Sequence, residues 1–370
     1  MVKEIIKNSQ KRRYYEKGFR YLKSILVTIL AASLLLSGCG KGGEEKASAE
    51  GEVLNVAYFP TSFKSSLSTI AYVKGFFEEE GVNVNLVNLQ SSADSLVALQ
   101  EGKIDVNPLG ITNTIQAIED GEGGVVIIGG SAQAGGIIIT TPENADKFKD
   151  LNNWKGATWA TGRSYTGDFV VRHYLSEIGI DSNVDVSSVD LGDNLSIIQS
   201  VSKGEADVGY ITADGARTAL DYGLELITDV DDIEHAYPCC RISSTQNAVD
   251  TKGDQLVAYL RAVIRAYDFI LANPDETIKI FTDLTSQDED YVRDVLYGDF
   301  ASAYVPDPAR QKVLNFSQYL LEAQALSSTD GIEEAINVDL YKKALDQILT
   351  KYPDNENYKT LLEIYNEFDS

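Results

Sequence analysis

The stretch Glu101-Gly-Lys-Ile-Asp-Val106 recurs 102 positions later as Lys203-Gly-Glu-Ala-Asp-Val208. In each copy a pattern of strand, turn and helix follows, ending at Gly121 in the first and at Gly223 in the second. A shared succession at one constant offset favours two lobes built on the same plan, with chance recurrence of a generic βα signal as the alternative. The matched positions are Gly102 and Gly204, Asp105 and Asp207, Val106 and Val208, Ala117 and Ala219, and Gly121 and Gly223, with Leu89 and Leu191 before the preceding helices.

Strand-like and helix-like patterns alternate along both halves of the chain. Strands separated by single helices predict right-handed crossovers, a largely parallel sheet and an α/β fold. After Asp232 the chain returns through a short strand and continues as amphipathic helices, beginning with residues 254–272. We expect strands at 54–58, 82–89, 104–108, 125–128, 136–140, 156–161, 184–191, 206–211 and 241–244, with helices at 93–100, 111–119, 167–177, 196–202 and 214–222.

The first 38 residues have the pattern of an export signal. A basic segment up to Lys23 precedes an uncharged apolar run, residues 24–36, which is too short for a comfortable membrane span. The following Leu36-Ser-Gly-Cys39 resembles the bacterial lipobox, in which the cysteine is lipidated and becomes the mature N-terminus; an ordinary signal with a chance cysteine is the alternative. Residues 39–52 are small and polar, as in a flexible tether. We expect an extracytoplasmic protein, lipid-anchored to the outer face of the cell membrane.

The chain is strongly acidic, with 56 Asp and Glu against 32 Lys and Arg and a formal net charge of −24 at pH 7. Removal of the basic N-terminal segment would make the remainder more acidic still. Such a surface repels phosphate backbones, which argues against nucleic acid as a partner. A chain of 370 residues is long enough for two domains.

Loops that lead from strands into helices are the expected site of ligand binding. In open α/β sheets, ligands lie beyond the carboxyl ends of the strands, and the hydroxyls, amides and free N–H groups at helix starts suit a small polar or anionic molecule. The loop at residues 161–167 combines glycine, hydroxyls and an arginine; capping and turn formation are the alternative roles of such residues. Tyr58, Tyr165 and Tyr210 could stack on a ring or pack in a core. The candidate ligand-binding residues are Pro60, Thr61, Ser62, Gly110, Thr112, Asn113, Ser131, Gln133, Arg163, Ser164, Tyr165, Thr166, Gly167, Asn194 and Asp214.

Two adjacent cysteines, Cys239 and Cys240, are the remaining thiols once Cys39 carries lipid. In an extended strand their side chains would point to opposite faces, so we expect a structural thiol pair near the return to the first lobe. A disulfide between neighbours would need a strained turn and is the alternative, with metal binding or catalysis ranked last. The two histidines, His173 and His235, form no recognisable metal motif, and we expect no metal site, no cofactor and no catalytic residues.

Several stretches together resemble a known family. They are Tyr58-Phe59-Pro60, Lys74–Gly81, Leu99–Val106 with the Gly-Thr-Asn loop after it, Leu151–Gly156 leading to Thr161–Gly167, and Arg261–Tyr267 with Asn273-Pro274. Over roughly residues 53–325 the chain resembles extracytoplasmic solute-binding proteins of ABC importers, in the subgroup for aliphatic sulfonates, taurine, nitrate and thiamine-type pyrimidines. Many relatives have an aromatic-Glu-Pro element that is absent from Val208–Gly215, so the resemblance does not carry a sulfonate or nitrate assignment.

The resemblance implies a periplasmic-binding-protein-like fold, with two βα lobes, a central cleft, two crossing strands and a helical C-terminal extension. Residues 1–38 would be the signal peptide, 39–52 the tether, 53–140 plus 233–370 lobe I, and 141–232 lobe II. The protein would be a monomer that captures a small molecule in the cleft, without turnover, and delivers it to an ABC permease and its ATPase. A pyrimidine-synthesis enzyme of the same fold, whose cysteine-rich stretch is similar to the Cys-Cys pair, and a sensing module for a separate receptor are the alternatives.

Overall fold

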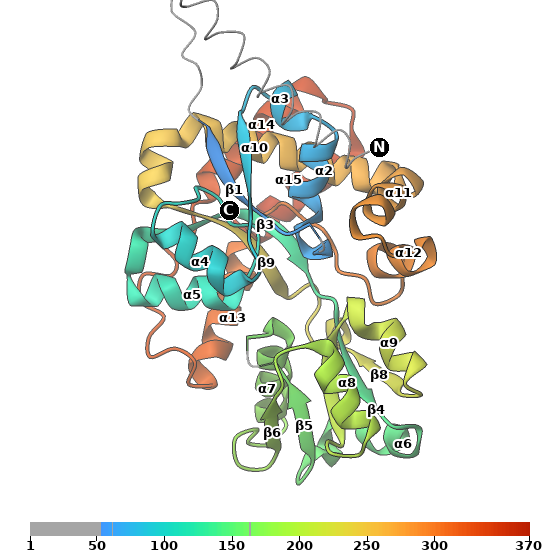
Figure 1. The fold of residues 1–370 in the computed structure, drawn as a ribbon. Coiled ribbons are helices and arrows are strands. Elements are labelled where there is room, and N and C mark those ends of the chain that lie inside the picture. Colours follow the sequence, from blue (N-terminus) through green and yellow to red (C-terminus); the bar gives the residue numbers. More distant parts are fainter. Residues whose placement is uncertain (1–52, 61, 163) are drawn as a thin grey trace, which may run out of the picture.

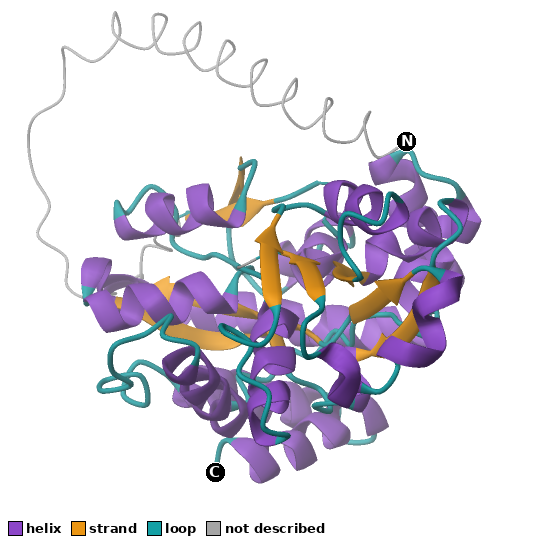
Figure 2. Ribbon diagram, turned by 90° about the horizontal axis from the view of Figure 1, so that it is seen from below, coloured by secondary structure: helices purple, strands orange, loops and turns teal. Residues whose placement is uncertain are grey.

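The computed structural model describes residues 53–60, 62–162 and 164–370. The expected signal peptide, Cys39 and the tether lie outside the described residues, as do the candidate site residues Thr61 and Arg163. Within the described part, the chain forms an upper and a lower lobe joined by extended segments (Figure 1). Seen from below, helices surround the strands of both lobes (Figure 2).

Lobe I holds two short two-stranded sheets. Strand β1 (Leu54–Tyr58) pairs in parallel with β2 (Val84–Asn88), and β3 (Val125–Gln133) pairs antiparallel with β9 (Pro238–Thr245). Both β3 and β9 are buried along their whole length, because helices cover them on either side. The covering helices of this half are α2 (Ser66–Val73), α3 (Phe76–Glu79), α4 (Ser92–Gln100) and α5 (Ile111–Asp120).

Lobe II is a five-stranded mixed sheet in the order β6-β5-β7-β4-β8. Strand β5 is parallel to β6 and β7, whereas β4 runs antiparallel to β7 and β8. Four of the five strands therefore run in one direction, in line with the prediction of a largely parallel sheet, and β4 is the exception, since it enters the lobe directly from β3 without a helical crossover. The elements are β4 (Gly136–Thr140), α6 (Ala145–Phe148), β5 (Thr158–Thr161), α7 (Thr166–Glu177), β6 (Ser187–Asp190), α8 (Asn194–Ser202), β7 (Val208–Thr212), α9 (Ala216–Asp221) and β8 (Glu225–Asp229).

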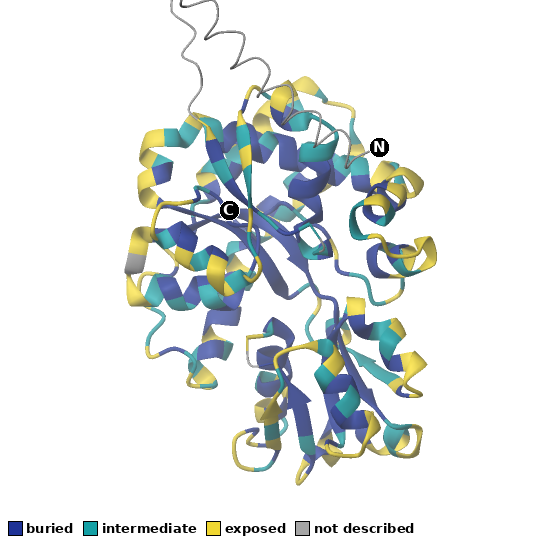
Figure 3. Cartoon of the chain, in the orientation of Figure 1, coloured by how far each residue is buried: buried dark blue, intermediate teal, exposed yellow. Residues whose placement is uncertain are grey.

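The chain after β9 is helical and returns to lobe I. Helix α10 (Gln246–Ala272) buries its apolar stripe against α2, α3 and α14, which makes it the central helix of the upper lobe. The others are α11 (Pro274–Thr285), α12 (Glu289–Tyr297), α13 (Arg310–Glu322), α14 (Val338–Lys351) and α15 (Glu356–Phe368). Buried residues line the sheets and the inner helix faces of both lobes, and exposed residues lie on the outer faces (Figure 3). Among the described residues, no helix is long and apolar enough to span a membrane.

The repeated stretches at residues 101–106 and 203–208 correspond to equivalent structure in the two lobes. The Asp105 carboxylate accepts a hydrogen bond of 2.8 Å from the backbone N–H of Asn55 in β1, and the Asp207 carboxylate accepts one of 2.8 Å from Thr158 N–H in β5. Each aspartate thus ties the end of a helix–turn segment to the neighbouring strand of its own lobe. The matched glycines also share a backbone conformation, with φ of 69° at Gly102 and 71° at Gly204, which L side chains rarely adopt.

One expected strand is missing from the described part of the structure, and one observed strand was not expected. The strand expected at 104–108 is reduced to single bridges, Val106 to Val56 and Asn107 to Ser243, because the chain touches each neighbouring strand at one position. Strand β8 was not expected; its half-buried edge position leaves no strict apolar alternation in the sequence.

Candidate functional site

Residues from both lobes converge where the lobes meet, and we name this set the junction site. Lobe I contributes residues from the loop after β1, from β3, β9 and α12, whereas lobe II contributes residues from the β5–α7 loop, α8 and β7. The connections between the lobes are direct hydrogen bonds, described below. The junction site comprises Lys64, Ser131, Cys239 and Tyr291 of lobe I and Tyr165, Thr166, Asn194, Tyr210, Thr212 and Asp214 of lobe II.

A polar network occupies the lobe II side of the junction site. The amide of Asn194 donates to the Thr212 hydroxyl at 2.9 Å and to the Asp214 carboxylate at 3.3 Å, and its oxygen accepts from Thr212 N–H at 3.0 Å. Tyr291 reaches across from α12 and donates its hydroxyl to the Asp214 carbonyl at 3.0 Å. Burial, reinforced by the charges of Asp214 and Asp288, raises the pKa of Tyr291 to about 12, so the phenol stays protonated and able to donate.

Two tyrosines form the aromatic wall of the junction site. The rings of Tyr165 and Tyr210 lie 5.8 Å apart at a tilt of 52°. A Cβ added at Gly167 would lie 2.4 Å from the Tyr210 ring, and one at Gly136 would lie 2.5 Å from the Tyr210 hydroxyl, so both positions require glycine for the ring to sit there. Burial raises the pKa of Tyr210 although the nearby Lys64 ammonium opposes this. Tyr210 is 2% exposed and Tyr165 is half-buried, so the wall is a neutral aromatic pair that is largely covered in this arrangement of the lobes.

A lysine and a cysteine face each other on the lobe I side. Lys64 Nζ lies 3.3 Å from Cys239 Sγ, and the Lys64 carbonyl is fixed by the Ser131 hydroxyl at 2.8 Å. Burial alone would lower the pKa of Lys64, but the negative charges around it, that of Cys239 first, outweigh burial and raise that pKa. Thr166, at the start of α7, donates to the Cys239 carbonyl at 3.3 Å and so connects lobe II to the same strand.

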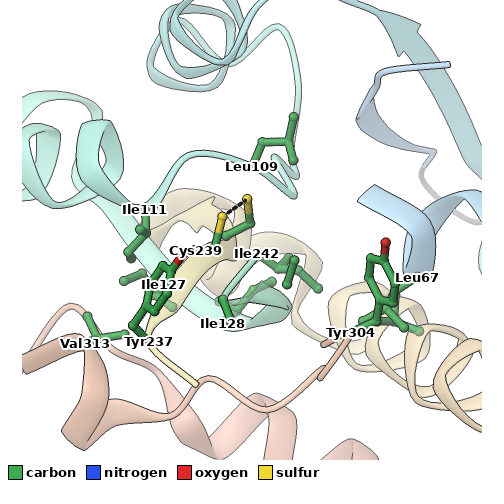
Figure 4. Packing of buried hydrophobic residues seen from close by; sticks show 14 of the residues in the cluster. Leu67, Leu109, Ile111, Ile127, Ile128, Tyr237, Cys239, Ile242, Tyr304 and Val313 are labelled. Atoms are coloured by element: carbon green, nitrogen blue, oxygen red, sulfur yellow. Dashed lines mark hydrogen bonds between the residues drawn. The ribbon is translucent and has the colours of Figure 1, made fainter. Parts of the chain in front are cut away.

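The expectation that the two cysteines point to opposite faces is wrong. Both thiols are free, and their sulfur atoms lie 3.6 Å apart. Figure 4 draws Cys239 with a dashed line that joins its sulfur to a second sulfur atom. The cause is a β-bulge: Pro238 pairs with Gln133 and Cys240 pairs with Ala132, which leaves Cys239 as an extra residue in β9. A bulge interrupts the strand alternation and turns neighbouring side chains toward one side.

The structure brings some of the predicted site residues together and separates others. Ser131, Tyr165, Thr166, Asn194 and Asp214 belong to the junction site. Gly167 lies directly beneath Tyr210, and the Gly110 amide lies beside Cys240.

The other predicted residues have different surroundings. Thr112 is buried in α5 and Gln133 is buried in β3, where its backbone pairs with Ala303, whereas Ser164 is exposed. Pro60, Ser62 and Asn113 are half-buried, and no hydrogen bond in the described part connects them with the junction site. Ligand contact stays a prediction for all of these residues.

Five residues of the junction site were absent from the set of candidate ligand-binding residues: Lys64, Tyr210, Thr212, Cys239 and Tyr291. Of these, Tyr210 was named only as a ring that could stack or pack in a core. Lys64 lies inside a loop that was predicted to face the ligand, and a lone cation in an otherwise hydroxyl-rich loop was the available signal. Tyr291 lies in the helical C-terminal part, and no local pattern marks it as facing lobe II. Its position depends on how α12 packs, which is a tertiary property.

Neither histidine belongs to the junction site. His173 Nδ1 lies 2.7 Å from a Glu322 carboxylate oxygen, and its ring stacks on Tyr319 at 3.9 Å, which places it at the contact of α7 with α13. A cavity of about 370 Å³ adjoins this contact, and one of about 210 Å³ lies between α9 and α12 beside Tyr291. In the described part of the chain, no cluster of three or more His, Cys, Asp or Glu side chains is arranged to hold a metal ion.

The chain belongs to the family described as NMT1/THI5 like, which it matches over residues 64–277. The formylaminopyrimidine-binding protein of Halalkalibacterium halodurans is 23% identical over 273 residues, covering 71% of this chain and 79% of the relative. This match extends the similarity beyond the family region and covers most of both proteins.

Solved structures show that the fold is that of periplasmic binding proteins, α/β with C-terminal helices. The aliphatic sulphonate binding protein SsuA from Escherichia coli superposes with a TM-score of 0.66 at 15% identity, covering 77% of this chain and 92% of its own. The nitrate-binding protein NrtA from Synechocystis PCC 6803 gives 0.66 at 15% identity, covering 84% and 91%. The desulfurization enzyme DSZB has the same fold, with a TM-score of 0.62 at 12% identity, covering 80% and 99%.

Proposed function

We propose that this chain is the solute-binding component of an ABC importer and captures one small molecule between its lobes without turnover. The observation that carries the proposal is the convergence of side chains from both lobes on the junction site. A ligand held there would contact both lobes at once and would therefore favour their closed arrangement. Its family and the binding proteins that share its fold support the same conclusion.

We infer that the ligand is a planar, polar heterocycle of the pyrimidine class rather than a free anion. Lys64 has the Cys239 sulfur as its neighbour, which its environment favours as a thiolate, and Asp214 adds a carboxylate, so the described part of the junction site offers little uncompensated positive charge. The Tyr165–Tyr210 wall suits a flat ring, and Asp214 and Thr212 suit ring or exocyclic N–H donors. The relative that binds a formylaminopyrimidine supports this choice.

We further propose that the chain is exported and held at the outer face of the cell membrane by lipid on Cys39. Residues 1–38 would be removed and residues 39–52 would form the tether. Lobe II would span residues 141–232 together with strand β4, which belongs to its sheet. A lipidated sample from membranes would carry diacylglycerol on Cys39, and Cys39→Ser would release the protein into the medium. Retention of the Cys39→Ser protein at the membrane would contradict the lipid anchor.

Ligand binding is tested first on the purified protein, by mass spectrometry of any small molecule released on denaturation. Thermal-shift screening with aminopyrimidines, alkanesulfonates and nitrate then follows, because a ligand at 100 times its Kd adds about 2.7 kcal/mol to stability. We expect an aminopyrimidine to raise the midpoint, and Asp214→Asn to weaken that response, whereas the exposed Asp221→Asn in α9 leaves it unchanged. A shift with nitrate or a sulfonate alone would contradict the pyrimidine class, and conversion of the bound compound to a product would contradict binding without turnover.

A further inference from the structure

The Cys239–Cys240 pair has a local geometry that a packing role does not require. The bulge in β9 places both sulfurs on one side, 3.6 Å apart, and neither thiol is in a disulfide. Their side chains lie at the point where lobe II touches β9, since Thr166 hydrogen-bonds to the Cys239 carbonyl. The residues are 7% and 4% exposed, so a reaction at these thiols requires the lobes to separate and admit the reagent.

The surroundings of Cys239 favour its thiolate. The Lys64 ammonium donates a hydrogen bond to Cys239 Sγ, with Nζ 3.3 Å from the sulfur. Cys240, Arg241, Tyr210 and Tyr237 are the other titratable groups that act on the same sulfur. The hydrogen bond from Cys240 and the positive charge of Lys64 together outweigh burial and lower the pKa of Cys239 to about 6. Cys240 keeps the proton, because donating to its neighbour raises the pKa of its own thiol.

We propose that Cys239 is a thiol-modification site that exchanges with low-molecular-weight disulfides, with Cys240 as the resolving thiol and Lys64 as the counter-ion. In the first step the Cys239 thiolate attacks a disulfide RSSR, which gives Cys239–S–S–R and releases RS⁻. In the second step Cys240 loses its proton to solvent and attacks the Cys239 sulfur, which releases a second RS⁻ and closes a Cys239–Cys240 disulfide. The protein is oxidised by two electrons and RSSR is reduced to two thiols.

We expect the Cys239–Cys240 disulfide to be reduced readily. Neighbouring Cα atoms are about 3.8 Å apart across a trans peptide, which is shorter than the usual 4.4–6.8 Å between disulfide-bonded residues. A strained disulfide is easily reduced and belongs to the labile, regulatory type. Either modification removes the thiolate partner of Lys64 and leaves its ammonium free to hold an anionic group in the junction site. This inference does not rest on the proposed transport function, because it needs no solute.

The test begins with the pH dependence of Cys239 alkylation by iodoacetamide, read by peptide mass spectrometry on the folded protein. We expect the rate to reach half its maximum near pH 6. Lys64→Met should move that point toward the ordinary thiol value of about 8.5. Lys103→Met, a matched change at an exposed lysine, should leave it in place. A wild-type half-point at or above that ordinary value, or identical profiles for wild type and Lys64→Met, would overturn the role of Lys64.

The second arm uses oxidised glutathione as the probe. Wild-type protein should lose two hydrogen atoms in mass and recover them with dithiothreitol, whereas Cys240→Ser should stop at a glutathione adduct on Cys239. Cys239→Ser should react at least tenfold more slowly than wild type, since Cys240 keeps its proton. Absence of an adduct on folded Cys240→Ser, with circular dichroism unchanged, would overturn the modification site whether or not a solute binds.

Discussion

The repeated aspartates allow a matched test of how each lobe is held together. Asp105 and Asp207 occupy equivalent positions, and each carboxylate accepts one backbone N–H at 2.8 Å. They differ in one respect. Asp105 also pairs with Lys252 of α10 at 2.9 Å, and the two side chains are 13% and 17% exposed. We expect Asp105→Ala to destabilise the protein more than Asp207→Ala does.

The size of the difference follows from these contacts. Loss of a hydrogen bond to a charged group costs about 1.5–3 kcal/mol, which is the expected effect of Asp207→Ala. Asp105→Ala loses the same interaction and in addition leaves the Lys252 ammonium nearly buried without its partner. Breaking a buried pair costs about 3–5 kcal/mol, and the partial exposure of this pair places it near the lower end. The total for Asp105→Ala is then about 4.5–6 kcal/mol.

Guanidinium chloride unfolding followed by fluorescence and circular dichroism measures both values. Combining Asp105→Ala with Lys252→Met removes the unpaired charge, and we expect it to recover about 1–2 kcal/mol of the loss, within the range of couplings between contacting residues. Equal costs for the two alanine variants, or no recovery in the double variant, would refute the assignment of the difference to Lys252. If the lobes unfold in separate transitions, each single variant should shift the transition of its own lobe.

Three further predictions concern the junction site and the core. Tyr291→Phe removes the hydrogen bond to the Asp214 carbonyl, which is worth about 0.5–1.5 kcal/mol. We expect calorimetry to show up to about tenfold weaker binding of the compound found by thermal shift, and an unchanged affinity would show that this contact does not hold the lobes together. Burial and the neighbouring Asp369 carboxyl raise the pKa of Asp307 to about 9, so between about pH 4 and 9 the folded protein binds more protons than the unfolded chain. The free energy of unfolding should therefore fall as the pH rises through this range, and Asp307→Asn should weaken this pH dependence in denaturation series. Gly136→Ala places a methyl group 2.5 Å from the Tyr210 hydroxyl and should cost about 1–3 kcal/mol in unfolding free energy, and a neutral effect would mean that the ring moves freely.

The two-lobe plan was predictable because its signal is local. Each copy of the repeated stretch combines a glycine with positive φ and an aspartate whose carboxylate accepts a hydrogen bond from the adjacent strand. The sequence pattern and the hydrogen bond therefore coincide within a few residues. The loops at helix starts were predictable for the same reason, and four residues predicted there, Tyr165, Thr166, Asn194 and Asp214, belong to the junction site. The fifth predicted residue of the site, Ser131, lies within strand β3 instead. The bulge in β9 was not predictable, since it depends on the register with β3 and not on the sequence of β9 alone.

The contacts of the junction site have long sequence separations. Lys64 and Cys239 of lobe I are 175 positions apart, and Asp214 and Tyr291, which connect the two lobes, are 77 apart. Such pairs form when distant segments fold together, so neither periodicity nor a motif in one segment identifies them. A residue with unremarkable local context, such as Tyr291, was therefore missed. A tyrosine that is part of a strand–turn–helix pattern, such as Tyr165, could be predicted to lie near the ligand.

The charge state of Lys64 favours binding over lysine chemistry at the junction site. A lysine that acts as a nucleophile needs a lowered pKa, so that its neutral amine is present near neutral pH. Here the negative charge of Cys239 is the first of several that raise the pKa of Lys64, which keeps it an ammonium and a hydrogen-bond donor. The reactive group of the pair is instead the Cys239 thiolate, and its reactivity depends on the same contact. A solute that attracts the ammonium away from the sulfur would therefore raise the pKa of Cys239, so solute binding and thiol reactivity should change together in one titration.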